Sequence, residues 1–208
     1  MGRGSYLGFI ACFFFSLSPL VAKEAFEKLP SKLPSKYTIS YGDPKAPISM
    51  TEYFSFSCPS CLAFIQKELT LLKEKYTNRG RVYLIFHPDP ADIVTMQVMR
   101  CFERLFPEEK QQFLEKIVKE LPCRSQQLAL LKVEKVMAQF RKEHEWIKDL
   151  SLVETSDAFY AGYQYITQAA APTKTPTVEI DGVLYEEFPT LEWIDHMIEK
   201  KEKLRSSL

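Results

Sequence analysis

Two cysteines separated by two residues, Cys58 and Cys61, are the side chains of this sequence best suited to covalent chemistry. They follow an apolar run at residues 48–56 and precede an amphipathic run at residues 62–76, a pattern that predicts a strand leading into a helix. Cys58 then falls at the helix cap, and Pro59 occupies the first helical position, where a missing N–H costs nothing. A CxxC motif at such a junction indicates thiol–disulfide chemistry more readily than a metal site.

The predicted helix start also makes Cys58 a reactive thiol. Unpaired N–H groups and a partial positive charge at a helix N-terminus favour a thiolate over a thiol. Cys61 lies one helical turn further on, close enough to form a disulfide with Cys58. A structural disulfide or one half of a zinc site are the alternatives, but zinc needs four ligands and the sequence has no second CxxC and no HxxxH motif. We therefore expect a redox-active pair, with no metal and no cofactor.

Composition and charge narrow the class of protein. The chain has 208 residues, enough for one domain or one domain with an insertion, and its 46% hydrophobic content supports a packed core. Its 27 basic residues balance its 27 acidic residues. Nucleic acids and acidic membrane surfaces usually select a basic excess, so the balance argues against both as main partners.

The N-terminus has the pattern of an export signal. Arg3 precedes an apolar stretch at residues 6–17, and small residues follow up to Ala22. Residues 1–22 are therefore predicted to be a secretory signal peptide that is cleaved near Ala22. A retained anchor is the alternative, although the apolar stretch is shorter than the roughly 20 residues that span a bilayer. Residues 23–36, with a repeated KLPS unit, are predicted to be an extended Pro/Lys linker.

The chain that follows begins with strand and helix patterns and continues with a long helical stretch. Strands are predicted at residues 37–41, 48–54 and 81–87, the last two joined through the helix as a parallel βαβ unit. Residues 91–170 carry no strand signal. Three helical stripes are predicted there, formed by Val94, Val98, Cys101 and Leu105, by Phe113, Ile117 and Leu121, and by Leu128, Leu131, Lys135 and Phe140.

Strand patterns return after this helical stretch. Residues 175–180 and 183–188 flank Asp181-Gly182, a dipeptide that strongly indicates a two-residue hairpin turn. Thr190 is predicted to cap a final helix. The predicted order is β-β-α-β, a helical insertion, then β-β-α, which is an α/β fold.

This order, and the residues around the CxxC motif, resemble the thioredoxin superfamily and more narrowly the exported DsbA-type thiol:disulfide oxidoreductases. The matching residues are 52–61 (EYFSFSCPSC), 43–47 (DPKAP), and Thr175-Pro176-Thr177 with the hairpin at Asp181-Gly182. The resemblance implies a thioredoxin fold at residues 37–90 and 171–208, interrupted by an all-helical domain at residues 91–170.

The resemblance also implies roles for individual residues. Cys58 would be the exposed nucleophile and Cys61 its buried partner, with Pro59 and Ser60 completing the motif. Pro176 would be a cis proline facing the pair, and the backbone of Thr175 would bind an extended substrate. Glu52 would be a buried acid that assists proton transfer, which agrees with the raised pKa expected of a buried carboxyl. The sequence departs from the family at Lys174, where a glycine is usual, so the loop is expected to be stiffer and locally positive.

These roles imply a periplasmic enzyme that introduces disulfides into unfolded, cysteine-containing exported proteins and is recharged by a membrane quinone-linked partner. We expect it to act as a monomer. Because Pro59-Ser60 lacks the histidine of the most oxidising family members, we expect a milder oxidant. The alternatives are a periplasmic reductase or isomerase of the same fold, a non-catalytic thioredoxin-fold chaperone, and a metal-binding CxxC module.

Two further cysteines remain after the signal, Cys101 and Cys123. A single helical hairpin separates them, so we predict a structural disulfide between them. Such a bridge would close a loop of about 22 residues and contribute about 3 kcal/mol in the chain-entropy description. A buried free thiol at Cys101, which shares a stripe with Val94 and Val98, is the alternative.

Overall fold

The structure is a computed structural model that describes residues 37–89, 92–102, 104–121, 125–144, 174–186 and 189–207. The predicted signal peptide (1–22), the predicted linker (23–36) and the predicted domain boundaries near residues 90 and 170 lie outside these residues. Among the described helices, none combines the length and the apolar character needed to cross a membrane.

A five-stranded sheet forms the centre of the fold, with strand order β1-β3-β2-β4-β5. β2 and β3 are parallel, and the other neighbouring pairs are antiparallel. The strands are β1 (Ile39–Tyr41), β2 (Ile48–Phe54), β3 (Val82–Pro88), β4 (Thr177–Ile180) and β5 (Val183–Tyr185). The mixed sheet and its strand order confirm the predicted α/β class.

β2 lies in the middle of the sheet and is covered on both faces. Every residue of the strand except Ser49 is buried. Its parallel pairing with β3 requires a crossover, which is the helix α2 (Pro59–Lys75) followed by the short 3-10 helix η2 (Thr77–Arg79). The end of β2 is therefore the point from which α2 starts.

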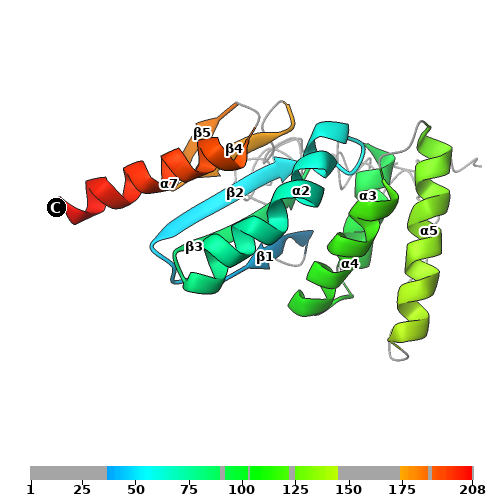
Figure 1. Ribbon diagram of the computed structural model, residues 1–208. Coiled ribbons are helices and arrows are strands. Elements are labelled where there is room, and N and C mark those ends of the chain that lie inside the picture. Colours follow the sequence, from blue (N-terminus) through cyan, green and yellow to red (C-terminus); the bar gives the residue numbers. More distant parts are fainter. Residues whose placement is uncertain are drawn as a thin grey trace, which may run out of the picture.

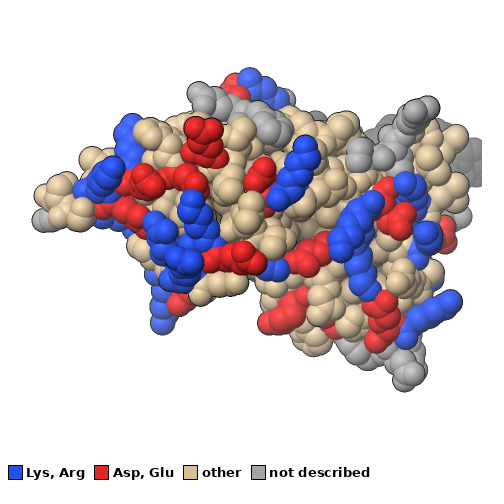
Figure 2. All heavy atoms as spheres, viewed as in Figure 1, with Lys and Arg blue, Asp and Glu red and all other residues tan. Residues whose placement is uncertain are grey.

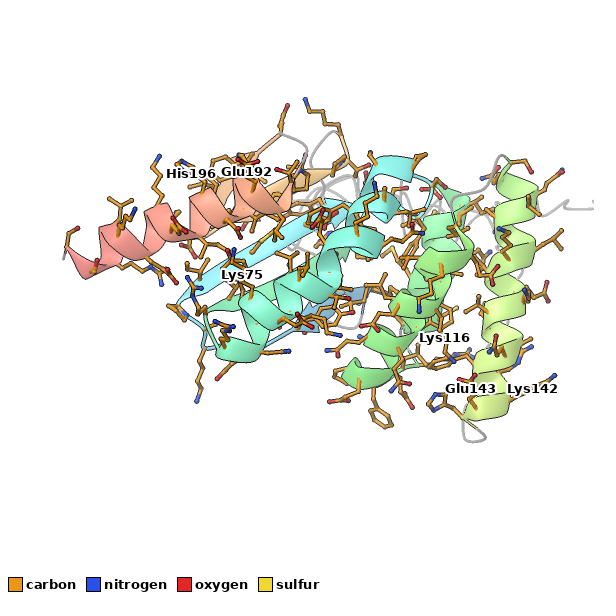
Figure 3. The ribbon with its side chains drawn as sticks, in the orientation of Figure 1. Lys75, Lys116, Lys142, Glu143, Glu192 and His196 are labelled. Atoms are coloured by element: carbon orange, nitrogen blue, oxygen red, sulfur yellow. A yellow bond between two sulfur atoms is a disulfide. The ribbon has the colours of Figure 1, made fainter. Side chains whose placement is uncertain are left out.

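Within the described residues, three helices follow β3, and a long helix lies near the C-terminus. They are α3 (Ile93–Phe102), α4 (Pro107–Glu120), α5 (Gln126–Glu143) and the final α7 (Leu191–Ser206). Figure 1 shows α3, α4 and α5 beside one another at one end of the sheet, with α2 and α7 in front of it. An ion pair joins Lys116 of α4 to Glu143 of α5 (Figure 3). Basic and acidic side chains are interspersed over the viewed face (Figure 2), so neither sign dominates it.

A row of phenylalanine rings joins the sheet to these helices. Phe54 at the end of β2 lies 4.9 Å from Phe56, centroid to centroid, and Phe56 lies 6.2 Å from Phe102 of α3. The row continues to Phe113 of α4 at 6.1 Å and to Phe140 of α5 at a further 5.4 Å. All five side chains are almost completely buried. The helices and the end of β2 therefore share one core, which holds the end of the strand that leads into α2.

The stripe predicted for α5 is wrong except at Phe140. Leu128 and Leu131 are 44% and 64% exposed. The buried face of the helix is formed instead by Ala129, Val133, Val136, Met137 and Phe140. The helix carries apolar residues on two faces, and their spacing alone does not indicate which face packs against the neighbouring helices. The observed face has smaller side chains at Ala129 and Val133, which allow close approach of a neighbouring helix.

Gly42, in the turn between β1 and β2, should be essential for stability. Its φ is +88°, and a Cβ placed on it would lie 2.8 Å from the carbonyl oxygen of Val82 and 3.1 Å from the Cβ of Thr77. We expect Gly42→Ala to lower the free energy of unfolding by about 2 kcal/mol or more, because backbone strain and a steric overlap add. Urea denaturation measures the change.

Gly80 provides the matched control for this substitution. Its φ is also positive, at +67°, but no atom lies within 4 Å of an added Cβ. Gly80→Ala should therefore lose only the backbone contribution, about 1 kcal/mol. An equal loss in the two variants would contradict the role given to the contact with Val82.

Candidate active site

Cys58 and Cys61 lie at the junction of β2 and α2 and are joined by a disulfide, with their Cα atoms 5.3 Å apart. Cys58 is the N-cap of α2, with extended backbone angles (φ −88°, ψ 108°), and Pro59 follows at the first helical position. Cys58 is partly exposed, whereas Cys61 is fully buried. An incoming thiolate can therefore reach the sulfur of Cys58 but not that of Cys61.

Two hydrogen-bond donors lie against the sulfur of Cys58. The N–H of Cys61 donates to it at 3.3 Å, and the hydroxyl of Ser60 lies 3.2 Å away. Both groups come from the first turn of α2, so the helix end supplies the donors expected to stabilise a thiolate. The CxxC motif alone does not predict that the Ser60 hydroxyl lies against the Cys58 sulfur, because the direction of the Ser60 side chain depends on the helical conformation.

The loop before β4 faces the cysteine pair. The Thr175–Pro176 peptide bond is cis, and the carbonyl oxygen of Thr175 lies 3.9 Å from the sulfur of Cys58. The pairing of Tyr53 in β2 with Thr177 in β4 brings this distant segment to the end of β2. The structure thus brings the Thr175–Pro176 bond to the Cys58–Cys61 pair, and both Thr175 and Pro176 are partly exposed there.

The loop at Lys174 was expected to be locally positive, but the charge of Lys174 has a partner. Its Nζ lies 2.6 Å from a carboxylate oxygen of Glu186, just after β5. The carbonyl of Lys174 accepts a hydrogen bond from the hydroxyl of Thr177 at 2.9 Å. The charge of Lys174 is therefore paired, and its backbone holds the start of β4.

Glu52 lies inside the sheet rather than at a solvated strand end. It is fully buried on β2, between Phe86 of β3 and Val178 of β4. Neither carboxyl oxygen has a hydrogen-bond partner among the described residues. Burial without a compensating partner raises the pKa of Glu52 well above its ordinary value of 4.5.

A hydrogen-bonded group beside the motif was not predicted from the sequence. Asp92, just before α3, accepts hydrogen bonds from the hydroxyls of Ser55 and Ser57, the residues that lead into Cys58. Asp92 also caps α3 through the N–H of Thr95. Asp92 stands just before an apolar stripe, which is a recognisable sequence signal for a helix N-terminus. Its contact with the serines before Cys58 has no such signal in the sequence.

The predicted disulfide between Cys101 and Cys123 stays a prediction. Cys101 is buried on α3, and its sulfur lies 3.4 Å from the carbonyl oxygen of Gln97 and 3.5 Å from the sulfur of Met137. Cys123 lies outside the described residues. Within the described ranges, no group of three or more His, Cys, Asp or Glu side chains is arranged to hold a metal ion.

The buried carboxyl of Glu52 should give the oxidised protein a characteristic pH dependence. Because its pKa is raised in the folded state, its contribution to stability is complete below pH 4.5 and declines as the pH rises through the folded pKa. In that interval the free energy of unfolding should fall by about 1.4 kcal/mol per pH unit. Urea denaturation of the oxidised protein at several pH values measures the slope.

Glu52→Gln should remove this slope and leave the oxidised protein more stable than the parent at neutral pH. Glu74→Gln, at an exposed position of α2, serves as the control and should keep the slope of the parent. If Glu52→Gln and Glu74→Gln had the same pH dependence, Glu52 would not be the group responsible.

Comparisons with known proteins agree with this geometry. A family model described as Thioredoxin matches residues 34–200. Among solved structures, α-DsbA1 of Wolbachia pipientis has a TM-score of 0.59 at 22% identity and covers 86% of this chain and 96% of its own. DsbA of Chlamydia trachomatis has a TM-score of 0.54 at 20% identity, with coverage of 84% and 95%. Comparison with curated protein sequences gives no match.

A protein-disulfide isomerase of Novosphingobium aromaticivorans is also similar, with a TM-score of 0.58 at 16% identity and coverage of 79% of this chain and 97% of its own. The family match spans most of the chain, and the order of elements along the chain, with α2 after the second strand and helices between β3 and β4, is the predicted one. The chain therefore belongs to the thioredoxin family and has the fold of the DsbA-type thiol:disulfide oxidoreductases, with a disulfide-forming pair, Cys58 and Cys61, at the N-terminus of α2.

Proposed function

We propose that the protein introduces disulfides into unfolded exported proteins by exchange with its Cys58–Cys61 disulfide. The observation that carries this proposal is the position of the Cys58 sulfur. It is accessible at the N-cap of α2, it has an N–H donor 3.3 Å away, and the carbonyl of Thr175 faces it at 3.9 Å. This arrangement favours attack on Cys58, because its sulfur can be reached and Cys61 can leave.

The reaction has two exchange steps. A substrate thiolate attacks the sulfur of Cys58, the Cys58–Cys61 bond breaks, and Cys61 leaves as a thiolate that takes up a proton. A second substrate thiolate then attacks the substrate sulfur of this mixed disulfide, and Cys58 leaves as a thiolate stabilised by the helix end. The substrate loses two electrons and gains a disulfide, and the enzyme becomes a dithiol. The backbone of Thr175 pairs with the extended substrate while the mixed disulfide exists.

Glu52 serves the first step as a proton reservoir for Cys61. Its raised pKa keeps the carboxyl protonated closer to neutral pH than an exposed carboxyl would be. Its complete burial, on the strand that leads into the motif, supports this role.

The cellular setting follows from the sequence features. The signal-like segment at residues 1–22 supports export to the periplasm, where we expect the protein to act as a monomer. Its substrates are unfolded proteins with reduced cysteines. A membrane quinone-linked partner returns the dithiol to the disulfide, since each turnover leaves the enzyme reduced by two electrons.

Reduction or isomerisation of disulfides is the second candidate. The described groups that donate to the Cys58 sulfur, the Cys61 N–H and the Ser60 hydroxyl, are uncharged. A thiolate without a cationic neighbour is stabilised less, and a less stable thiolate makes the disulfide a weaker oxidant. This observation favours a reduction potential for the Cys58–Cys61 couple at which reduction of substrate disulfides competes with oxidation of substrate thiols.

Serine variants of the two cysteines test the proposed mechanism. The assay is the oxidative refolding of a reduced, unfolded protein with several cysteines, started with oxidised enzyme and no glutathione. We expect Cys58→Ser to abolish disulfide transfer, because no nucleophilic or electrophilic sulfur remains exposed. In a separate incubation with a small-molecule disulfide, we expect the Cys58 thiolate of Cys61→Ser to attack that disulfide, release one thiol and keep the mixed disulfide, seen as a mass increase that a reductant reverses.

Cys101→Ala is the matched control, because it removes a buried cysteine outside the site. It should retain disulfide transfer at the rate of the parent. Disulfide transfer by Cys58→Ser would contradict the mechanism. If the parent protein bound unfolded chains but transferred no disulfide, the result would favour a chaperone.

A further inference from the structure

A single carboxyl group fastens the segment that leads into Cys58 to the start of α3. Asp92 Oδ1 accepts a hydrogen bond from the hydroxyl of Ser57 at 2.7 Å, and Oδ2 accepts one from the hydroxyl of Ser55 at 2.6 Å. The same carboxyl accepts from the N–H of Thr95 at 2.8 Å and from its hydroxyl at 2.7 Å. Ser55 and Thr95 are buried, so the group is part of the packed structure.

The backbone of this segment is held by the same group. The N–H of Phe56 donates to the Thr95 hydroxyl oxygen at 2.9 Å, and the N–H of Ser57 donates to the Ser55 hydroxyl oxygen at 2.9 Å. The N–H of Cys58 donates to the carbonyl of Ser55 at 3.1 Å. Three consecutive N–H groups before the helix are therefore satisfied, and the two hydroxyls that satisfy two of them both donate to Asp92.

Ser57 is the residue next to Cys58, so its position restricts the backbone angles available to Cys58. Those angles direct the sulfur toward the N–H of Cys61. Any rotation at Ser57 would carry the Cys58 sulfur away from this donor. The hydrogen bond from Ser57 to Asp92 opposes such rotation, from a residue 35 positions away in the sequence.

We propose that Asp92 is a positioning residue for Cys58: through Ser57 and Ser55, it holds the sulfur of Cys58 against the N–H of Cys61. The proposal rests on the proposed function only in treating Cys58 as the nucleophile. Without the Asp92 contacts, the Cys58 thiolate would accept a weaker hydrogen bond from the N–H of Cys61. The Cys58 thiol would then be less acidic, and less reactive at neutral pH. The helical segment after β3 would thereby set the reactivity of a cysteine in the sheet domain.

The negative charge of Asp92 acts in the opposite direction, because an anion near Cys58 disfavours a second negative charge. Two charge-matched comparisons separate the two effects. The parent and Ser57→Ala both keep the carboxyl of Asp92. Asp92→Asn and Asp92→Ala both lack its charge, but asparagine retains an oxygen that can accept the hydroxyl of Ser57. The other ionisable groups on elements that approach Cys58 are Glu52 on β2 and the Lys174–Glu186 pair, and they are unchanged in all variants.

The experiment measures the rate at which iodoacetamide alkylates Cys58 in the reduced full chain, as a function of pH and followed by peptide mass. We expect the apparent pKa of Cys58 to be higher in Ser57→Ala than in the parent, and higher in Asp92→Ala than in Asp92→Asn. A shift of about half a pH unit in each pair corresponds to roughly threefold slower alkylation below the pKa. Ser125→Ala, which removes the side-chain cap of α5, is the control and should match the parent.

Equal pKa values within each charge-matched pair would overturn the proposal. A pKa that differs only between the parent and Asp92→Asn would likewise overturn it, since charge alone would then explain the effect. If Asp92→Ala fails to fold, the comparison of Ser57→Ala with the parent decides. The readout concerns the thiol itself, so it stands whether or not the protein transfers disulfides, and a failure of the proposed function is seen separately in the refolding assay.

Discussion

The 3.3 Å contact between the Cys61 N–H and the Cys58 sulfur exists because α2 begins where β2 ends. β2 reaches that point as the central strand, paired with β3 on one side and β4 on the other. The pairing with β4 also carries Thr175 to the sulfur. The row of phenylalanine rings from Phe54 to Phe140 and the Asp92 contacts then fix the same strand end from the helical side. Each of these features serves to position one sulfur atom.

Local patterns predicted much of this frame. The bounds of β2 match the predicted residues 48–54, because a central strand carries apolar residues on both of its faces. The hairpin is confirmed at Asp181 and Gly182, whose φ angles of 49° and 83° are those that such a turn requires. Thr190 caps α7 by accepting from the N–H of Trp193, as predicted. In each case the determining interaction lies within a few residues of the chain.

Interactions between distant segments escaped prediction for a physical reason. Which apolar face of α5 packs is decided by the shape of the neighbouring helices, so the stripe through Leu128 and Leu131 was wrong. The contact of Asp92 with Ser57 joins the end of β2 to the start of α3, and no local spacing encodes that meeting. The pairing of Lys174 with Glu186 likewise needs the β4–β5 hairpin to bring the two side chains together. Sequence alone identified the reactive pair but not what restrains it.

The reduction potential of the Cys58–Cys61 couple is the most direct measure of what this geometry achieves. Equilibration of the full chain with glutathione buffers, in a variant that lacks Cys101 and Cys123, gives it without interference from the other thiols. We expect a reversible transition above about −180 mV, at which the protein can pass its disulfide to folding chains. A potential near or below about −230 mV would contradict the role as an oxidant and assign the same site to reduction.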